Sequence, residues 1–311
     1  MHNRLIGRKW VKKAALFLCV LLGVSVLTGC GKSDSPYADA PAAEAAQEEA
    51  APAKAPEEQT AAPAAEAAET SVEAAKAPDA EAPAADTYAA DPLFEKSEGV
   101  MTHEEYMSAE LNANVVIETF VQAKQALIGG KASIYTQDPD GGYFLYEAGL
   151  TDEAYQRLVP GQKIRVRGTK SEYSKETEIL NAVIEPLDGF WKAEPEDVTA
   201  LLGTRDLVTY QNCHVRFSGM TVEPAAEGSD EAFLYRWDGS GKEGDDLYFN
   251  VSKDGQTYTF TIETMLSDSS TQIYKDVQAL KVGDVVDMEG YLYWYLGPSP
   301  HIISLTKAEQ N

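Results

Sequence analysis

The N-terminal region of this chain lacks an apolar run long enough to cross a bilayer. Its apolar segment covers residues 14–27, whereas a membrane-spanning helix needs about 20 apolar residues. The residues before this segment include five basic side chains and no acidic one. A basic start, a short apolar centre and a small-residue end are typical of an export signal. We therefore predict that residues 1–29 are a signal peptide.

Catalytic motifs are also missing. The sequence has no Gly-x-Ser-x-Gly, no His-Glu-x-x-His and no phosphate-binding loop pattern. His103, His214 and His301 lie too far apart in sequence to show metal-ligand spacing. We therefore expect a protein that is not an enzyme and that uses no cofactor.

Cysteine is scarce, with three residues in the whole chain. Leu27-Thr28-Gly29-Cys30 resembles a bacterial lipobox, which implies cleavage before Cys30 and acylation of its thiol with palmitate or a similar chain. The alternative is a plain secretory signal with an incidental cysteine. An acylated Cys30 would leave Cys213 without a disulfide partner, and we expect Cys213 to be a small core residue.

Aromatic side chains are almost absent from residues 31–98, which are mostly Ala, Pro and Glu. Such a segment cannot bury enough apolar surface to offset its ordering entropy. We predict that residues 30–98 are a disordered linker with a root-mean-square span on the order of 45 Å.

Positive charge is in deficit over residues 99–311, which contain 17 basic and 34 acidic residues and carry a net charge of −17. An acidic surface repels nucleic-acid phosphates and anionic lipids. We therefore rank nucleic acid last among the partners considered.

The C-terminal part contains a weak internal repeat. Ile134–Asp138 and Leu234–Asp238 both read aliphatic-Tyr-x-x-Asp, at an offset of 100 residues. Several other positions align: Asn112 with Asn212, Val115 with Val215, Gly161 with Gly283 and Gly168 with Gly290, the glycines at an offset of 122. We infer a duplicated unit whose second copy gains a hairpin or longer strands around residues 256–262.

One copy of the unit contains three β-rich segments, a capped helix at residues 151–158, and two further β-rich segments. This is the order of the five-stranded OB barrel. The second copy repeats it, with its helix at 271–280, and short helices at 102–111 and 196–202 precede the two copies. We predict a mainly β protein with two tandem OB-like barrels, in domains 99–190 and 191–311, each with a helix between strands 3 and 4.

The repeat segments are similar to the extracytoplasmic tandem OB-fold lipoproteins of Gram-positive bacteria. The residues that carry this resemblance are VQAKQALIGGKASIYTQDPDGGYFLY, LVPGQKIRVRG, EAFLYRWDGSGKEGDDLYF and LKVGDVVDMEGYLYWYLGP. The resemblance implies tandem OB domains on the outer face of a bacterial cell membrane. It implies no known activity.

Strand alternation suggests where a ligand could bind. Tyr291, Tyr293 and Tyr295 share one face with Asp287 and Glu289. The equivalent face of the first copy carries the basic residues Arg165 and Arg167, and Tyr173. The tyrosines could stack a sugar ring or a base, or they could pack the two barrels together.

Two acidic loops are weaker candidates for a calcium site. They lack EF-hand spacing, and ordinary hairpin turns explain them as well. Their residues are Asp138, Asp140, Asp238, Glu243, Asp245 and Asp246.

We therefore expect a lipid-anchored, non-catalytic binding module for an envelope glycan or a peptide. The alternative is an accessory subunit of the cell envelope that binds an exported protein. Nucleic-acid capture fits the predicted fold but conflicts with the net charge.

Overall fold

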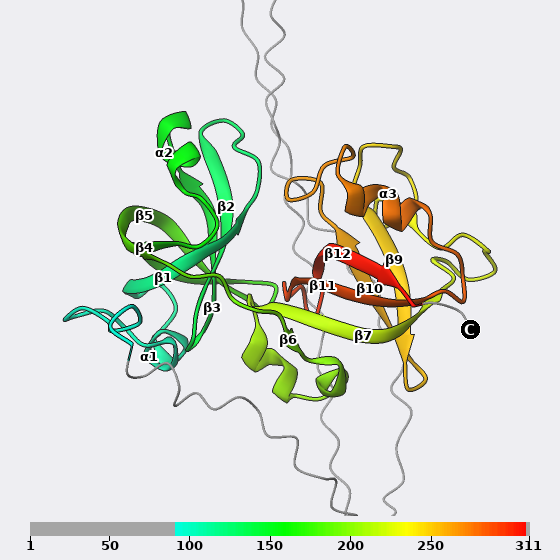
Figure 1. Ribbon diagram of the computed structural model, residues 1–311, viewed down its shortest axis with the longest axis horizontal. Helices are drawn as coiled ribbons and strands as arrows, with labels where there is room; N and C mark the ends of the chain where they lie inside the picture. The colour runs from blue at the N-terminus through cyan, green and yellow to red at the C-terminus, as the bar shows by residue number, and fades with distance from the viewer. Residues whose placement is uncertain (1–90, 309–311) are drawn as a thin grey trace, which may run out of the picture. The chain divides into compact units, whose positions relative to one another are not determined.

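The computed structural model of this protein describes residues 91–308, which are mainly β (Figure 1). The predicted signal peptide, Cys30 and the linker up to residue 90 lie outside the described residues. All described residues belong to one compact unit. Five strands form a closed barrel in the order β1-β2-β3-β5-β4, here called barrel 1. They are β1 (Asn114–Lys124), β2 (Lys131–Asp138), β3 (Gly141–Gly149), β4 (Gln162–Tyr173) and β5 (Glu176–Phe190).

The other strands form a seven-stranded sheet in the order β6-β7-β11-β12-β10-β9-β8. An additional pairing of β7 with β9 closes five of them into a ring, here called ring 2. Its pairing pattern matches that of barrel 1, including one parallel pair, β10 with β12, where barrel 1 has β3 with β5. The strands are β6 (Glu196–Asp197), β7 (His214–Glu223), β8 (Leu234–Tyr235), β9 (Leu247–Lys253), β10 (Gln256–Ile262), β11 (Val285–Tyr291) and β12 (His301–Lys307).

Two short helices occupy the positions predicted for them. Helix α2 (Asp152–Arg157) lies between β3 and β4, and α3 (Gln272–Gln278) lies between β10 and β11. Helix α1 (His103–Ser108) lies within the helix predicted at residues 102–111 and begins with a capping box of Thr102 and Glu105. No helix within residues 91–308 is long and apolar enough to cross a membrane.

The helix predicted at residues 196–202 is wrong. This segment forms the edge strand β6 and the single 3-10 turn η2 (Thr199–Leu201), and a second turn, η3 (Asp206–Tyr210), leads into β7. The backbone N–H groups of η2 find partners at short range, and β6 pairs in parallel with β7. Strand pairing therefore replaces the expected helix.

The repeat alignment holds at the start of each unit and fails later. Asn112 and Asn212 both have positive φ, 68° and 65°, just before β1 and β7. The motif at Leu234–Asp238, however, falls on the two-residue edge strand β8, whereas β9 takes the place of β2 in the ring. The added residues therefore lie before β9, and the strand expected to be extra, β10, belongs to the ring.

Gly168 and Gly290 occupy equivalent places on β4 and β11. A Cβ atom at Gly168 would lie 2.4 Å from Ile179 Cγ2, and one at Gly290 would lie 2.3 Å from the backbone oxygen of His301. Both glycines sit at a shift in strand register. The close approach of the neighbouring strand at each bulge therefore requires glycine.

Barrel 1 and ring 2 each enclose an apolar core, which provides the main driving force for folding. The barrel 1 core includes Ile117, Ile134, Leu145, Ile164 and Val166. The ring 2 core includes Phe217, Met220, Phe249, Phe260 and Met288, with Cys213 at its edge. Cys213 is buried, as expected, and burial raises its thiol pKa to about 12.

Candidate functional site

The junction between barrel 1 and ring 2 is built around three aromatic side chains. Tyr135 of β2 and Phe144 of β3 pack against Tyr291 of β11 in one buried cluster. The rings of Tyr135 and Tyr291 are stacked, with centroids 4.6 Å apart and an interplanar angle of 13°. Gly142 fits the same junction, because a Cβ there would lie 2.4 Å from the carbonyl carbon of Asn212.

Buried polar groups complete this junction. The Tyr135 hydroxyl is hydrogen-bonded to His301 Nδ1 at 2.9 Å. Burial lowers the pKa of His301 to about 3, so its ring is neutral at physiological pH. The Gln137 side chain accepts a hydrogen bond from the backbone N–H of His214 at 2.7 Å. The two bodies are thus joined by directed bonds as well as by apolar contact.

Glu176, at the start of β5, is the most deeply buried carboxyl of the junction, with 0% exposure. Its two oxygens accept hydrogen bonds from Asn212 Nδ2 at 2.6 Å and from the backbone N–H of Trp294 at 2.8 Å. Burial raises the pKa of Glu176 to about 8, although both hydrogen bonds act in the opposite direction. Glu176 is therefore mostly protonated at neutral pH.

A second, half-buried carboxyl joins the two bodies further along. Glu263 accepts a hydrogen bond from Gln125 Nε2 at 2.9 Å, and the backbone N–H of Ala126 donates to Met265. Burial raises the pKa of Glu263 to about 7, and the nearby Asp246 raises it further.

Four tyrosines lie at one side of this junction and form what we call the tyrosine platform. Tyr146 lies on β3, Tyr173 ends β4, and Tyr293 and Tyr295 lie in the connection from β11 to β12. Tyr146 and Tyr173 are 40% and 46% exposed. The ring of Tyr173 is 6.3 Å from that of Tyr295, and Phe144 links Tyr146 to Tyr293, at 6.4 and 5.5 Å.

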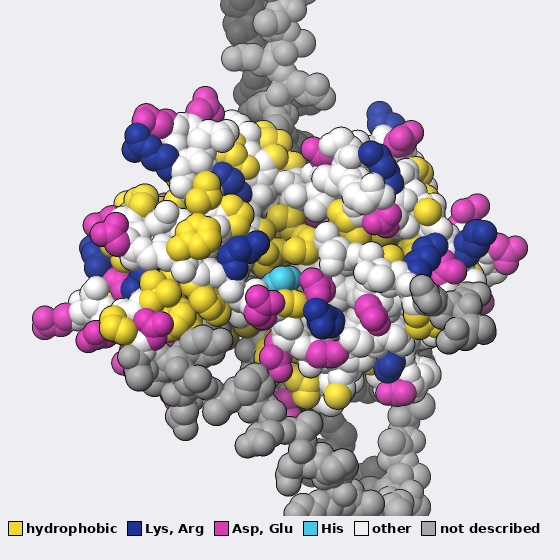
Figure 2. All heavy atoms as spheres, in the orientation of Figure 1, with side chains coloured by type: hydrophobic (Ala, Val, Ile, Leu, Met, Phe, Trp, Pro, Cys, Tyr) yellow, Lys and Arg dark blue, Asp and Glu magenta, His cyan; other side chains and the backbone are white. Residues whose placement is uncertain are grey.

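The platform is formed because the β4–β5 connection of barrel 1 meets the β11–β12 connection of ring 2. The tight turn after Tyr173 is bonded to the β11–β12 connection, where the backbone N–H of Leu296 donates to Ser174 at 2.6 Å. Figure 2 shows hydrophobic side chains gathered in the middle of the face drawn, between barrel 1 and ring 2 of Figure 1.

Glu178 of β5 is a buried carboxyl whose charge acts on two of the platform tyrosines. It is 5% exposed, and burial raises its pKa to about 7, with a further increase from the charge of Glu147 and a decrease from a hydrogen bond with Ser171. Its charge in turn helps raise the pKa values of Tyr146 and Tyr293. Glu178 is therefore about half-neutral at pH 7, which reduces the negative charge beside the exposed rings.

The site predicted from the sequence is only partly assembled. Tyr173, Tyr293 and Tyr295 come together, whereas Tyr291 packs between barrel 1 and ring 2, which is the alternative that the sequence left open for these tyrosines. Tyr291 is 3% exposed, because the strand register shifts between Glu289 and Gly290 and the last residue of β11 turns into the junction.

The predicted arginine stripe belongs to a different surface. Arg165 donates to Glu118 at 2.8 and 3.1 Å, and Arg167 is paired with Glu185 at 3.4 Å. All of these residues lie on barrel 1. Neither arginine is paired with Asp287 or Glu289 of ring 2. In ring 2, Asp287 accepts from Gly219 and Glu289 pairs with Arg216 at 2.5 Å.

The acidic loops already have partners within the chain. Asp138 and Asp140 contact Lys96, Asp238 caps Ser240, Asp245 accepts from the Lys242 backbone, and Asp246 accepts from Thr264. Within residues 91–308, no group of three or more His, Cys, Asp or Glu side chains has a metal-binding arrangement.

Sequence reasoning missed Tyr146 and Glu178. Tyr146 ends the run Tyr143-Phe144-Leu145-Tyr146, whose first three residues are buried. An apolar run of this kind predicts burial for all of its members, so the pattern did not indicate that Tyr146 is exposed. Glu178 lies on a strand in which polar and apolar residues alternate, so the pattern did not set it apart from other polar residues. The hairpin register of β2 with β3 was the one signal that could have placed Tyr146 at the end of the barrel.

No family model matches this chain, and no curated protein matches it. Several solved structures are similar to it. A replication protein A heterotrimer bound to single-stranded DNA is 16% identical, with a TM-score of 0.22, over 26% of this chain and 61% of that one, less than two thirds of its length. A murine DNA-binding protein bound to double-stranded DNA is 8% identical, with a TM-score of 0.32, over 63% of this chain and 97% of that one. A deletion mutant of the single-stranded DNA-binding protein from Thermus aquaticus is 15% identical, with a TM-score of 0.22, over 65% of this chain and 96% of that one.

These neighbours contradict the partner ranking made from the sequence. That ranking placed a glycan, a peptide or an exported protein ahead of nucleic acid, whereas the three neighbours are described as DNA-binding or DNA-bound proteins. The burial of Tyr291 also removes part of the aromatic stripe on which the glycan assignment depended. Net charge governs contacts with phosphates and says nothing about surfaces on which bases stack. All three TM-scores lie below 0.5, so the ligand has to be argued from this chain's own residues.

Proposed function

We propose that barrel 1 and ring 2 are tandem OB-like barrels that bind single-stranded nucleic acid, with the tyrosine platform as the contact surface. The OB assignment is supported by strand order. In both bodies the third and fifth strands pair in parallel, and a short helix lies between the third and fourth strands.

The position of the platform is the observation that carries the proposal. OB barrels contact extended ligands on strands 2 and 3 and on the loops next to them, including the connection between strands 4 and 5. Tyr146 lies on the third strand of barrel 1, and Tyr173 lies at its 4–5 connection. Tyr293 and Tyr295 lie in the 4–5 connection of ring 2. Both barrels therefore contribute aromatic rings to one surface.

Stacking would supply most of the binding free energy. An aromatic side chain that stacks on a base contributes about 1–3 kcal/mol, with little sequence preference. The net charge of −17 over residues 99–311 disfavours contacts with the phosphates. Binding should therefore depend weakly on salt, unlike that of a protein with many phosphate contacts, which loses roughly 10³–10⁵-fold in affinity between 50 and 200 mM salt.

Fluorescence anisotropy with a labelled single-stranded oligothymidine tests this proposal. The double variant Tyr173→Ala/Tyr295→Ala should bind roughly 30- to 30,000-fold more weakly, because two stacking rings are lost. The matched control is Trp237→Ala, because Trp237 is 47% exposed and lies outside the platform. Equal losses in the two variants, or no binding by the wild-type protein, would refute the assignment.

We also propose that the protein is a lipoprotein anchored through Cys30 on the outer face of a bacterial membrane. Support comes from the basic and apolar residues before Leu27-Thr28-Gly29-Cys30 and from the resemblance to Gram-positive tandem OB lipoproteins. Metabolic labelling with a palmitate analogue should mark the wild-type protein and not Cys30→Ala. Equal labelling of the two proteins would contradict the anchor without touching the nucleic-acid proposal.

A further inference from the structure

Residues 93–97 lie across barrel 1 as a short segment that we call the strap. Lys163 Nζ donates to the backbone oxygen of Leu93 at 2.8 Å, and the backbone N–H of Ser97 donates to Glu118 at 3.4 Å. The ring of Phe94 packs edge-on against Phe120, with centroids 5.7 Å apart. The linker predicted to run to residue 98 therefore ends earlier, because its last residues are held on the barrel.

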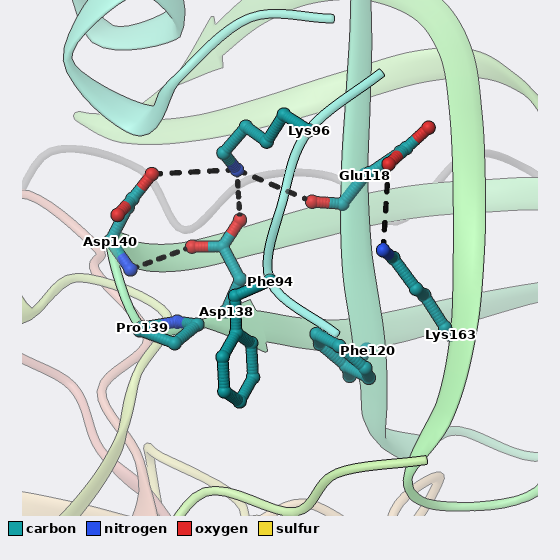
Figure 3. A pocket seen from close by; sticks show the side chains of 8 residues that line it. All are labelled: Phe94, Lys96, Glu118, Phe120, Asp138, Pro139, Asp140 and Lys163. Atoms are coloured by element: carbon teal, nitrogen blue, oxygen red, sulfur yellow. Dashed lines mark hydrogen bonds and ion pairs between the residues drawn. The ribbon is translucent and has the colours of Figure 1, made fainter. Parts of the chain in front are cut away.

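Lys96 is the polar centre of the strap, and Figure 3 shows its ammonium group among three oxygens. Nζ lies 2.6 Å from Asp138 Oδ2, 3.5 Å from Asp140 Oδ2 and 3.5 Å from the backbone oxygen of Glu118. These oxygens come from the end of β2, the turn after it and the middle of β1. An alkylammonium has three N–H donors; two of them are used by Asp138 and the Glu118 backbone oxygen, and Asp140 adds an ion pair.

Asp138 is held in place by donors other than Lys96. Its Oδ1 accepts from the backbone N–H groups of Asp140 and Gly141, at 2.8 and 3.2 Å, and its Oδ2 accepts from the Tyr143 hydroxyl at 3.2 Å. The carboxylate would therefore keep its orientation without the lysine. Burial raises the pKa of Asp138, and the charge of Lys96 opposes that shift. A buried carboxylate of this kind needs a cation beside it.

We propose that the Asp138 pocket of barrel 1 is a binding site for a primary alkylammonium group, filled in this chain by Lys96, and that this occupancy fixes the strap to the barrel. This site is separate from the tyrosine platform. It determines where the chain that precedes barrel 1 leaves the barrel surface.

Chemical rescue of Lys96→Ala in the full chain tests the pocket. The variant should melt several degrees lower than wild type, and ethylammonium chloride should restore at least half of the lost melting temperature by placing an ammonium group beside Asp138. Tetramethylammonium chloride at equal ionic strength has the same charge but no N–H donor, so it should restore nothing. The matched control is Lys131→Ala, which removes an exposed pair with Glu147 and should show no rescue.

Four outcomes would overturn the proposal: an unchanged melting temperature in Lys96→Ala, no rescue by ethylammonium, equal rescue by tetramethylammonium, or equal rescue of Lys131→Ala. If Lys96→Ala does not fold unaided, the refolded yield with each cation replaces the melting temperature and is read in the same way. Adding Asp138→Asn to Lys96→Ala should abolish the rescue, and a rescue that persists would place the ammonium elsewhere.

Discussion

Replacing Glu176 by glutamine should change how the stability of the protein depends on pH. Glu176 is fully buried, and its pKa is raised from 4.5 to about 8, mainly by burial. The folded protein therefore keeps a proton that the unfolded chain releases between these two pH values. Because the folded state binds more protons in this window, the free energy of unfolding falls as pH rises.

The size of the effect follows from the shift. Each pH unit within the window changes the free energy of unfolding by about 1.4 kcal/mol per proton. For Glu176 this amounts to on the order of 5 kcal/mol between pH 4.5 and pH 8. Glu178 and Glu263, with pKa values raised to about 7, add to the same downward trend below pH 7.

Urea unfolding of wild type and Glu176→Gln between pH 5 and pH 9 measures this contribution. The variant should have a slope shallower by about one proton up to pH 8, so its stability relative to wild type should rise by several kcal/mol between pH 5 and pH 8. The matched control is Glu104→Gln on the exposed face of α1, which leaves the junction unchanged. Parallel pH profiles for wild type and Glu176→Gln would refute the protonated, buried state of this carboxyl.

Two further substitutions test the packing. Gly290→Ala should destabilise ring 2 by about 1–3 kcal/mol or more, because its Cβ would meet the His301 backbone oxygen at 2.3 Å; Gly297→Ala, with open space around it, is the control, and equal melting temperatures would contradict the close approach. Tyr135→Phe should cost about 1–3 kcal/mol in chemical denaturation, because it removes the hydrogen-bond partner of buried His301. A change below about 0.3 kcal/mol would show that this bond contributes little.

The sequence predicted the local elements of this fold better than their pairing. The capping box at Thr102 and the helix at α2 follow from short-range patterns. The alignment of Leu234–Tyr235 with β2 is wrong, because a match between short motifs does not show which segment pairs with the neighbouring strands. The glycines at 168 and 290 kept their equivalence because a close backbone approach admits no other residue.

The candidate site was predicted only in part, because a bulge interrupts the alternation of side chains between the two faces of a strand. A register shift in β11 turned Tyr291 into the junction and left Tyr293 at its margin. Tyr146 joins the platform through Phe144, whose ring packs against Tyr293, a residue far away in sequence. Glu176 gains its raised pKa from burial between two bodies, a property that no local pattern encodes.

The most direct test compares two labelled oligonucleotides of equal length, one with bases and one fully abasic. Both carry the same phosphates, so they separate stacking from charge. Binding of the wild-type protein to the base-containing strand and not to the abasic strand would agree with recognition by the tyrosine platform. Equal binding of the two strands, or binding of neither, would contradict it.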